Sequence, residues 1–177
     1  MTPHLRAWLA PLLLLQLGAT TDKLAGDGPL DFRCDRMDIE TKPNRAICHD
    51  NVVVRRGELL VCCRTFEGFA DEEWQWQRFI CHDDVRAQRA DESMWSERAE
   101  FLLASSDLIL TGKPHVQRGK SMFEGRKVVV NVESDRANIS QPRGVFVSQE
   151  KLAPPVPLVP EGKALPSKCP IPADPVH

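Results

Sequence analysis

The feature that most constrains this chain is a short pattern that recurs about every 30 residues. Each copy is an apolar, strand-like run that ends in two polar or small residues, such as Asp50-Asn51, and closes on a small residue after arginine, such as Gly57. The copies span residues 47–57, 80–90 and 109–119. So short a unit cannot bury its apolar face alone, so the pattern predicts stacked β-strands that share one core.

A second pattern follows each copy after a constant interval: Cys63-Arg64-Thr65, Ser96-Glu97-Arg98 and Gly125-Arg126-Lys127, with an earlier Cys34-Asp35-Arg36. Residues 94–103 have helical propensity, but their register in the repeat favours a strand. Alternation and turn residues predict strands at 30–40, 46–55, 59–66, 74–86, 94–103, 108–117, 121–132 and 136–140.

The first 19 residues predict a secretory signal peptide. An apolar run over 7–17 ends in Leu17-Gly18-Ala19, a small-residue cleavage pattern. The run is shorter than the roughly 20 residues that span a bilayer, so cleavage after Ala19 and export are expected. We interpret 20–29 as a flexible leader, 30–147 as the folded domain and 148–177 as a proline-rich tail, extended or disordered, that carries Cys169.

Composition and motifs exclude several classes of function. The net charge of −2 comes from interleaved acidic and basic residues, which argues against nucleic-acid binding. No convincing nucleophile–base pair and no glycine-rich phosphate loop is present, so we expect neither an enzyme nor a cofactor. Trp74, Trp76 and Trp95 are compatible with a ligand groove, but aromatic residues on strands more often belong to a core or a rim.

Strand alternation divides the repeat into two faces. The set with Cys48, Val52 and Val54 is the more apolar, and we assign it inward. The remaining positions then point outward or lie at turns: His49, His82, Arg55 and His115.

The cysteines allow three interpretations. Cys48-His49 and Cys81-His82 suggest zinc, but neighbours in a strand diverge, which disfavours a tetrahedral site. Stacked units favour disulfides between equivalent positions, Cys48 with Cys81 and Cys34 with Cys63, leaving Cys62 and Cys169 over. The third possibility is that several are reduced core thiols.

These motifs together resemble the LptA/OstA family of periplasmic lipopolysaccharide-transport proteins. The family pattern Gly-Asn-Val-x-Val-x-x-Gly corresponds to residues 50–57, and its later Leu-x-Leu-x-Gly-Asn-Pro to residues 108–114. The three-residue patterns at 34–36 and 96–98 correspond to the family's Asp-Arg words. The resemblance covers roughly residues 30–139.

The resemblance implies an all-β, open β-jellyroll of stacked short strands whose apolar groove shields lipid A acyl chains in the periplasm. Lipopolysaccharide and related jellyroll domains of a transport bridge would be its partners, with possible head-to-tail homo-oligomers. The expected acyl contacts are Met37, Cys48, Val52, Val54, Phe66, Val85, Phe101, Leu110, Val116 and Val128. Two alternatives stay open: a structural or interaction module without lipid, and an exported metal or redox protein.

Association is expected through the edges of the stack. The first strand, around 32–39, and the last, around 128–139, have no second partner within one stack. Unpaired edge groups are templates for strand addition. We therefore predict head-to-tail contacts at both ends.

Overall fold

The computed structural model describes residues 29–147 and 164–174. Residues 29–147 form one antiparallel 12-stranded sheet, and no helix occurs in either described range. The expected signal peptide lies outside the described residues. The strands are β1 (Leu30–Arg33), β2 (Arg36–Thr41), β3 (Asn44–Arg56), β4 (Leu59–Ala70), β5 (Trp76–Arg89), β6 (Glu92–Leu102), β7 (Asp107–Thr111), β8 (His115–Arg118), β9 (Ser121–Glu124), β10 (Lys127–Asn131), β11 (Arg136–Ser140) and β12 (Arg143–Val145).

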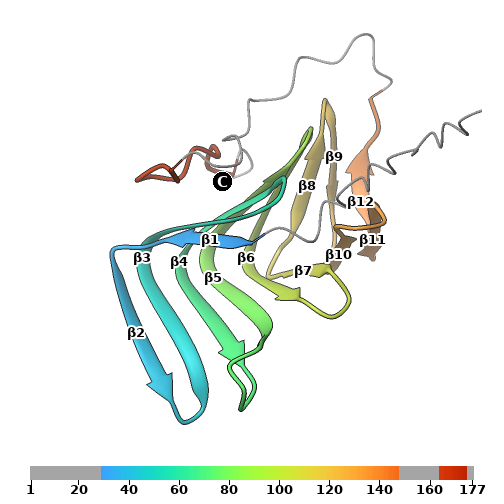
Figure 1. Ribbon diagram of the computed structural model, residues 1–177. Coiled ribbons are helices and arrows are strands. Elements are labelled where there is room, and N and C mark those ends of the chain that lie inside the picture. The colour runs from blue at the N-terminus through green and yellow to red at the C-terminus, as the bar shows by residue number, and fades with distance from the viewer. Residues whose placement is uncertain (1–28, 148–163, 175–177) are drawn as a thin grey trace, which may run out of the picture.

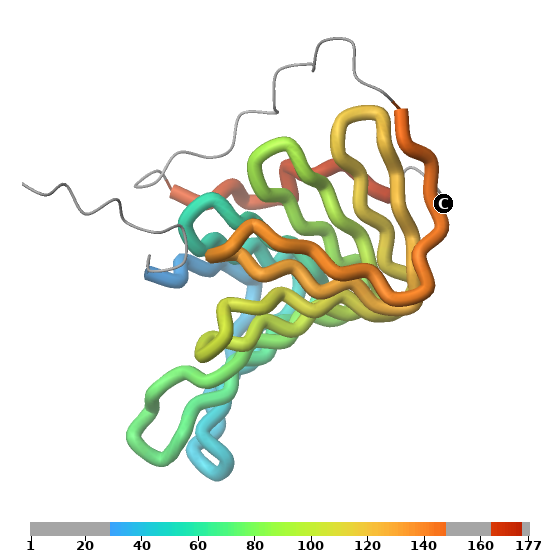
Figure 2. The backbone as a smooth tube through the Cα atoms, turned by 90° about the vertical axis from the view of Figure 1, so that its right-hand side faces the viewer, coloured from blue at the N-terminus to red at the C-terminus, as the bar shows by residue number. Residues whose placement is uncertain are grey.

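The sheet is folded along a crease into two wings, so the molecule is an open β-jellyroll (Figure 1). The crease interrupts the pairing of the long strands between His49 and Val52 and between His82 and Val85. The upper wing holds β1, β8, β9, β12 and residues 52–56, 59–63, 85–89 and 92–96. The lower wing holds β2, β7, β10, β11 and residues 44–49, 65–70, 76–82 and 98–102. Figure 2 shows the wings from the β11–β12 end.

The recurring sequence pattern is what bends the chain. In β3, in β5 and between β7 and β8, the chain crosses the crease through two consecutive residues with left-handed backbones: Asp50 and Asn51, Asp83 and Asp84, Gly112 and Lys113. Glycine, asparagine and aspartate are the residue types that adopt this conformation most readily. At Gly112 a Cβ atom would lie 2.5 Å from the Cβ of Glu97, so only glycine fits there.

The apolar inner faces of the wings form the main core. Cys48, Val52 and Val54 belong to this cluster, as the alternation predicted. The outward assignment of His49, His82, Arg55 and His115 also agrees with the strand register. Arg55 and His115 are nevertheless buried, which the sequence did not suggest.

All six cysteines form disulfides, but the predicted pairings were wrong. The bonds join Cys34 to Cys48, Cys63 to Cys81 and Cys62 to Cys169, with Cα separations of 5.7, 5.8 and 5.8 Å. Phe66 of β4 lies opposite both Cys48 and Cys81, so these two are two strands apart, about 9.5 Å. In the same way, β3 lies between Cys34 and Cys63. The predicted pairings fail because the strands form an antiparallel meander, in which equivalent positions of the sequence repeat fall on every second strand.

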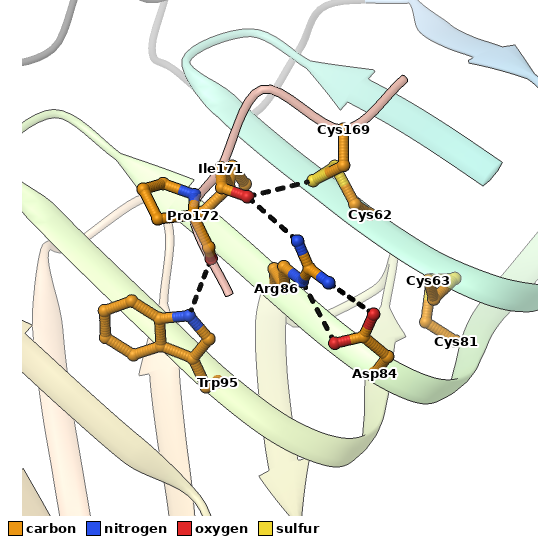
Figure 3. Close-up of a disulfide and its surroundings, with 9 residues drawn as sticks. All are labelled: Cys62, Cys63, Cys81, Asp84, Arg86, Trp95, Cys169, Ile171 and Pro172. Atoms are coloured by element: carbon orange, nitrogen blue, oxygen red, sulfur yellow. Dashed lines mark hydrogen bonds and ion pairs between the residues drawn. A yellow bond between two sulfur atoms is a disulfide. The ribbon is translucent and has the colours of Figure 1, made fainter. Parts of the chain in front are cut away.

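Residues 164–174, which we call the strap, cross the outer face of the upper wing without forming helix or strand (Figure 3). Cys169 is bonded to Cys62, and Ile171 packs with Val53 and Leu60 in a second, small core. The tail was expected to be extended or disordered, and this part of it is ordered without helix or strand. An ordered strap is possible because the disulfide and the second core offset its loss of chain entropy.

The strap follows one row of outward residues across four strands. Cys62 lies opposite Arg86, Arg86 opposite Trp95, and Trp95 opposite His115. Arg86 donates to the carbonyl of Ile171 at 3.2 Å, the Trp95 indole donates to that of Pro172 at 3.1 Å, and Asp174 lies 3.5 Å from His115. This strap accounts for the burial of His115.

Several expected strand boundaries differ from the structure. The strands expected at 108–117 and 121–132 are each broken in two, because the crease falls at Gly112-Lys113 and at Gly125-Arg126. Residues 94–103 are strand, as their repeat register predicted. The last edge is β11 and β12: β10, expected at an edge, pairs with both β7 and β11.

Candidate functional site

The two wings enclose an apolar cleft on their inner faces. Its volume is about 390 Å³, including the open space at its mouth. Arg56 is its one charged lining residue, and its guanidinium lies 5.1 Å from the ring centre of Phe101. The cleft is lined by Val54, Arg56, Leu59, Val61, Phe66, Phe79, Cys81, Ala99, Phe101 and Leu108.

An aromatic row leads from the cleft to the solvent. Phe66 stacks on Phe79 at 5.4 Å between ring centres and on Phe32 at 6.3 Å. Phe79 continues to Trp76 at 5.7 Å, and Trp76 to Trp74 at 6.3 Å. The two central rings are buried, whereas Phe32, Trp74 and Trp76 are exposed. The row therefore carries the apolar surface of the cleft outward.

Gly68 makes room for this row. A Cβ atom at Gly68 would lie 2.9 Å from the Trp76 ring and 3.3 Å from Phe79. The absence of a side chain at Gly68 thus lets the Trp76 ring pack against β4. Asp71 fixes the adjoining turn, since its carboxylate accepts from the backbone amides of Glu73 and Gln75.

Exposed aliphatic residues extend the apolar surface on β2. Met37 and Ile39 pair with Cys48 and Ala46, and so lie on the inner face of the lower wing. Both are exposed, Ile39 at 60 %. The groove is therefore open and apolar toward the β1–β2 end.

Toward β11 and β12 the groove is closed by its own side chains. Leu108, Leu110, Val116, Val128, Val130 and Val132 are all buried members of the core. Arg89 of the upper wing also donates to Asp135 at 2.9 Å, and Asp135 lies in the turn between β10 and β11 of the lower wing. The groove thus has an open half around β1–β5 and a closed half around β7–β11.

One carboxyl group at the closed half is perturbed. Burial raises the pKa of the Glu92 carboxyl above its ordinary value, and the nearby carboxylates Asp135 and Asp91 add to this rise. The Arg118 guanidinium, 3.5 Å away, acts in the opposite direction. Within the described residues no cluster of three metal-ligating side chains occurs. His49 and His82 contact carboxylates on the outer face, Asp38 at 3.0 Å and Glu67 at 3.5 Å.

The model of the LptA/LptD N-terminal domain family of lipopolysaccharide-transport proteins matches residues 33–136, which is more than half of the chain. The chain belongs to this family. No curated protein sequence matches it. Among solved structures it is similar to LptH, the LptA-homologous periplasmic component of the lipopolysaccharide transport device of Pseudomonas aeruginosa. The TM-score is 0.63 at 15 % identity, over 72 % of this chain and 99 % of LptH, which establishes the shared fold.

The residues predicted for acyl contact in this LptA-type chain lie on the inner faces, but in different surroundings. Val54, Phe66 and Phe101 line the cleft. Met37 is exposed beside it. The others are buried in the main core without lining the cleft: Cys48, Val52, Val85, Leu110, Val116 and Val128.

Other cleft residues were missed by the sequence reasoning. Leu59, Val61 and Leu108 lie in inward register with the predicted positions, so extending the alternation to every strand would have found them. Phe79 could have been found in the same way, because it lies two residues before Cys81. The exposed Trp74 and Trp76 lie at the rim of the groove, whereas Trp95 lies on the outer face beneath the strap.

Residues 29–147 and 164–174 contain no helix that is long and apolar enough to cross a membrane.

Proposed function

We propose that this protein shields the acyl chains of lipopolysaccharide in the open half of its groove while the lipid crosses the periplasm. The proposal rests on the apolar cleft and its continuous aromatic row, which ends in exposed rings at Phe32 of β1 and at Trp74 and Trp76 beside the β4–β5 turn. A soluble protein rarely exposes a contiguous apolar surface of this kind unless it binds a partner there.

The energetics favour an acyl chain as the ligand. Each buried methylene contributes about 0.8 kcal/mol, so ten of them supply roughly 8 kcal/mol before ordering costs. Val54, Leu59 and Phe101 offer no hydrogen-bond donor or acceptor on their side chains, and an acyl chain needs none. Binding would therefore depend on the chain rather than on a specific polar contact in the cleft.

A charged side chain in the cleft tests this function. Val54→Glu should abolish lipopolysaccharide binding, because an entering chain would desolvate the carboxylate at a cost of several kcal/mol. The measurement is displacement of a fluorescent lipid from the purified full-length protein. Circular dichroism must show that the variant is folded, because Val54 is buried.

Two substitutions at exposed positions test the same site with less risk of misfolding. Phe32→Gln changes an exposed inner-face ring, and Arg33→Gln changes its exposed neighbour on the outer face of the same strand. Phe32→Gln should weaken lipid binding roughly tenfold, about 1.4 kcal/mol. Arg33→Gln should leave it unchanged. Equal binding by wild type, Val54→Glu and Phe32→Gln would exclude the groove as the lipid site.

Head-to-tail assembly is the second part of the proposal. β2 has one strand partner and so does β11, so each end of the lower wing carries an unpaired edge. The exposed Ile39 lies on the first edge. A related jellyroll domain or a second copy would continue both the sheet and the apolar groove.

The assembly is tested by a charge at this junction. Ile39→Lys should raise the dissociation constant for self-association roughly tenfold, because the ammonium group would be buried in an apolar contact. Glu40→Lys, on the outer face of the same strand, is the matched control. Light scattering after gel filtration over a range of concentrations reports the association. A wild-type protein that stays monomeric and cross-links to no jellyroll partner contradicts the assembly.

The periplasmic location rests on the predicted signal peptide and on the family. N-terminal sequencing of the protein from fractionated cells should find Thr20 as its first residue. Retention of Met1 would exclude export by cleavage.

A further inference from the structure

The rim of the closed half carries an ion pair that joins the two wings. Arg89 is the last residue of β5 in the upper wing, and Asp135 precedes β11 in the lower wing. They meet at 2.9 Å although 46 residues separate them. The Arg89 side chain is only 11 % exposed, whereas the Asp135 side chain is 66 % exposed. The pair is therefore desolvated on the arginine side alone, and its strength lies between that of a buried pair and that of a surface pair.

Further contacts lie on the same rim. Glu92, directly opposite Arg89 in the β5–β6 hairpin, lies 3.5 Å from Arg118 of β8. Arg118 also reaches Asp91 at 3.2 Å. The charged groups around the pair are therefore Glu92, Asp91 and Arg118 from the upper wing. Closer to the cleft, Arg56 of β3 covers Phe101 of the lower wing, which is a second contact between the wings.

The region beneath this rim is where the groove stops. Val130 and Val132, buried in the core, flank the end of β10 just before the turn that holds Asp135. Met94, two residues after Glu92, is fully buried below the opposite hairpin. A chain that extends past Leu108 of the cleft must part these side chains, and the wings can separate there only if Arg89 releases Asp135.

We propose that the Arg89–Asp135 pair is a latch that sets how long an acyl chain the groove admits. With the latch closed, the chain occupies the cleft and the open half. With the latch open, the chain runs on between β7, β10 and the upper wing toward the β11–β12 end. This inference rests on the proposed function, since it names what limits the same site.

The test compares chain-length profiles and local opening in the full-length protein. The probes are saturated lysophospholipids with tails of about eight to about sixteen carbons, a range over which each added methylene tightens binding when it is buried. For wild type, affinity should rise with length and then level off once the cleft is filled. In Asp135→Asn and in Arg89→Gln, affinity should level off at longer tails than in wild type. The longest tail should bind roughly three- to tenfold more tightly.

A charge swap and a matched control separate the latch from general destabilisation. The double variant Arg89→Asp/Asp135→Arg restores the pair and should restore the wild-type plateau. Glu100→Gln removes a carboxylate that pairs with Arg78 at 3.2 Å and Arg98 at 3.0 Å, all three within the lower wing, and should leave the profile unchanged. The same profile in wild type and Asp135→Asn overturns the latch, and so does an equal shift in Glu100→Gln.

Hydrogen exchange without lipid distinguishes the latch from the proposed function. Amides of residues 88–93 and 132–135 should exchange faster in Asp135→Asn than in wild type and return to wild-type rates in the charge swap. If no tail binds wild type at all, the proposed function fails, and the exchange rates alone decide whether the wings are latched. Unchanged exchange at both segments overturns the latch.

Discussion

The open and closed halves of the groove are built from the same repeat but are stabilised by different means. In the closed half, short strands bring Leu110 and Val128 together with no exposed surface. In the open half, the end strands β1 and β2 carry exposed inner-face side chains, Phe32 and Ile39. A groove that its own side chains do not fill gains less stability from packing, so its stability must come from elsewhere.

In the open half, disulfides supply the stability that packing does not. Each of the three bonds has at least one cysteine in the stretch from β1 to β5, and no cysteine lies in any strand from β6 to β12. Cys34–Cys48 and Cys63–Cys81 lie beside the crease on the inner face. A covalent bond stabilises mainly by restricting the unfolded chain, which requires no filled interior. Packing and covalent bonds therefore substitute for each other along one sheet.

The largest expected effect comes from removing packing in the closed half. Leu110→Ala should lower the free energy of unfolding by about 2–5 kcal/mol, because the side chain is fully buried and leaves a cavity. Phe32→Ala, in the open half, should cost less than about 1 kcal/mol. Urea unfolding followed by circular dichroism measures both. Equal losses would show that the two halves are not distinct.

The next effect comes from removing a bond of the open half. Replacing both Cys63 and Cys81 by alanine should cost about 2–4 kcal/mol, since the bond closes a loop with a sequence separation of 18 residues. Hydrogen exchange should rise first in β3–β5 and last in β7 and β10. A uniform rise in exchange rates over the whole sheet would contradict the view that the two halves are stabilised by different means.

The smallest effect concerns pH at the rim of the closed half. The folded-state pKa of Glu92 is raised above its ordinary value of 4.5, so protonation favours the folded state. Wild type therefore loses stability relative to Glu92→Gln as the pH rises through the folded pKa, and the two proteins become alike below pH 4.5. Thermal unfolding across this window checks the sign. A variant less stable than wild type at neutral pH would show that the Arg118 contact outweighs burial.

The fold could be predicted from the sequence because its signals are local. Asp50-Asn51 and Asp83-Asp84 are residue types that indicate the left-handed backbone at the crease. The alternation around Val52 and Val54 indicates which side chains lie on the inner face. These features act over a few residues. The repeat register even decided correctly that residues 94–103 form a strand against their helical propensity.

What the sequence could not provide depends on contacts between distant strands. The disulfide partners follow from strand order, which placed β4 between Cys48 and Cys81. Cys169 was the one signal for the strap, but its partner lies 107 residues away. The closure of the groove depends on how far the wings separate, and neither Arg89 nor Asp135 is unusual in sequence.

Two adjacent cysteines carry a consequence for oxidative folding. Cys62 and Cys63 are neighbours, yet the first bonds to the strap and the second to β5. The pleat of β4 sends them to opposite faces, so the strand itself sorts which thiol meets which partner. An unfolded chain has no such sorting, and Cys48 or Cys81 then reaches either thiol. Assembly of β3, β4 and β5 before oxidation therefore favours the native pairing.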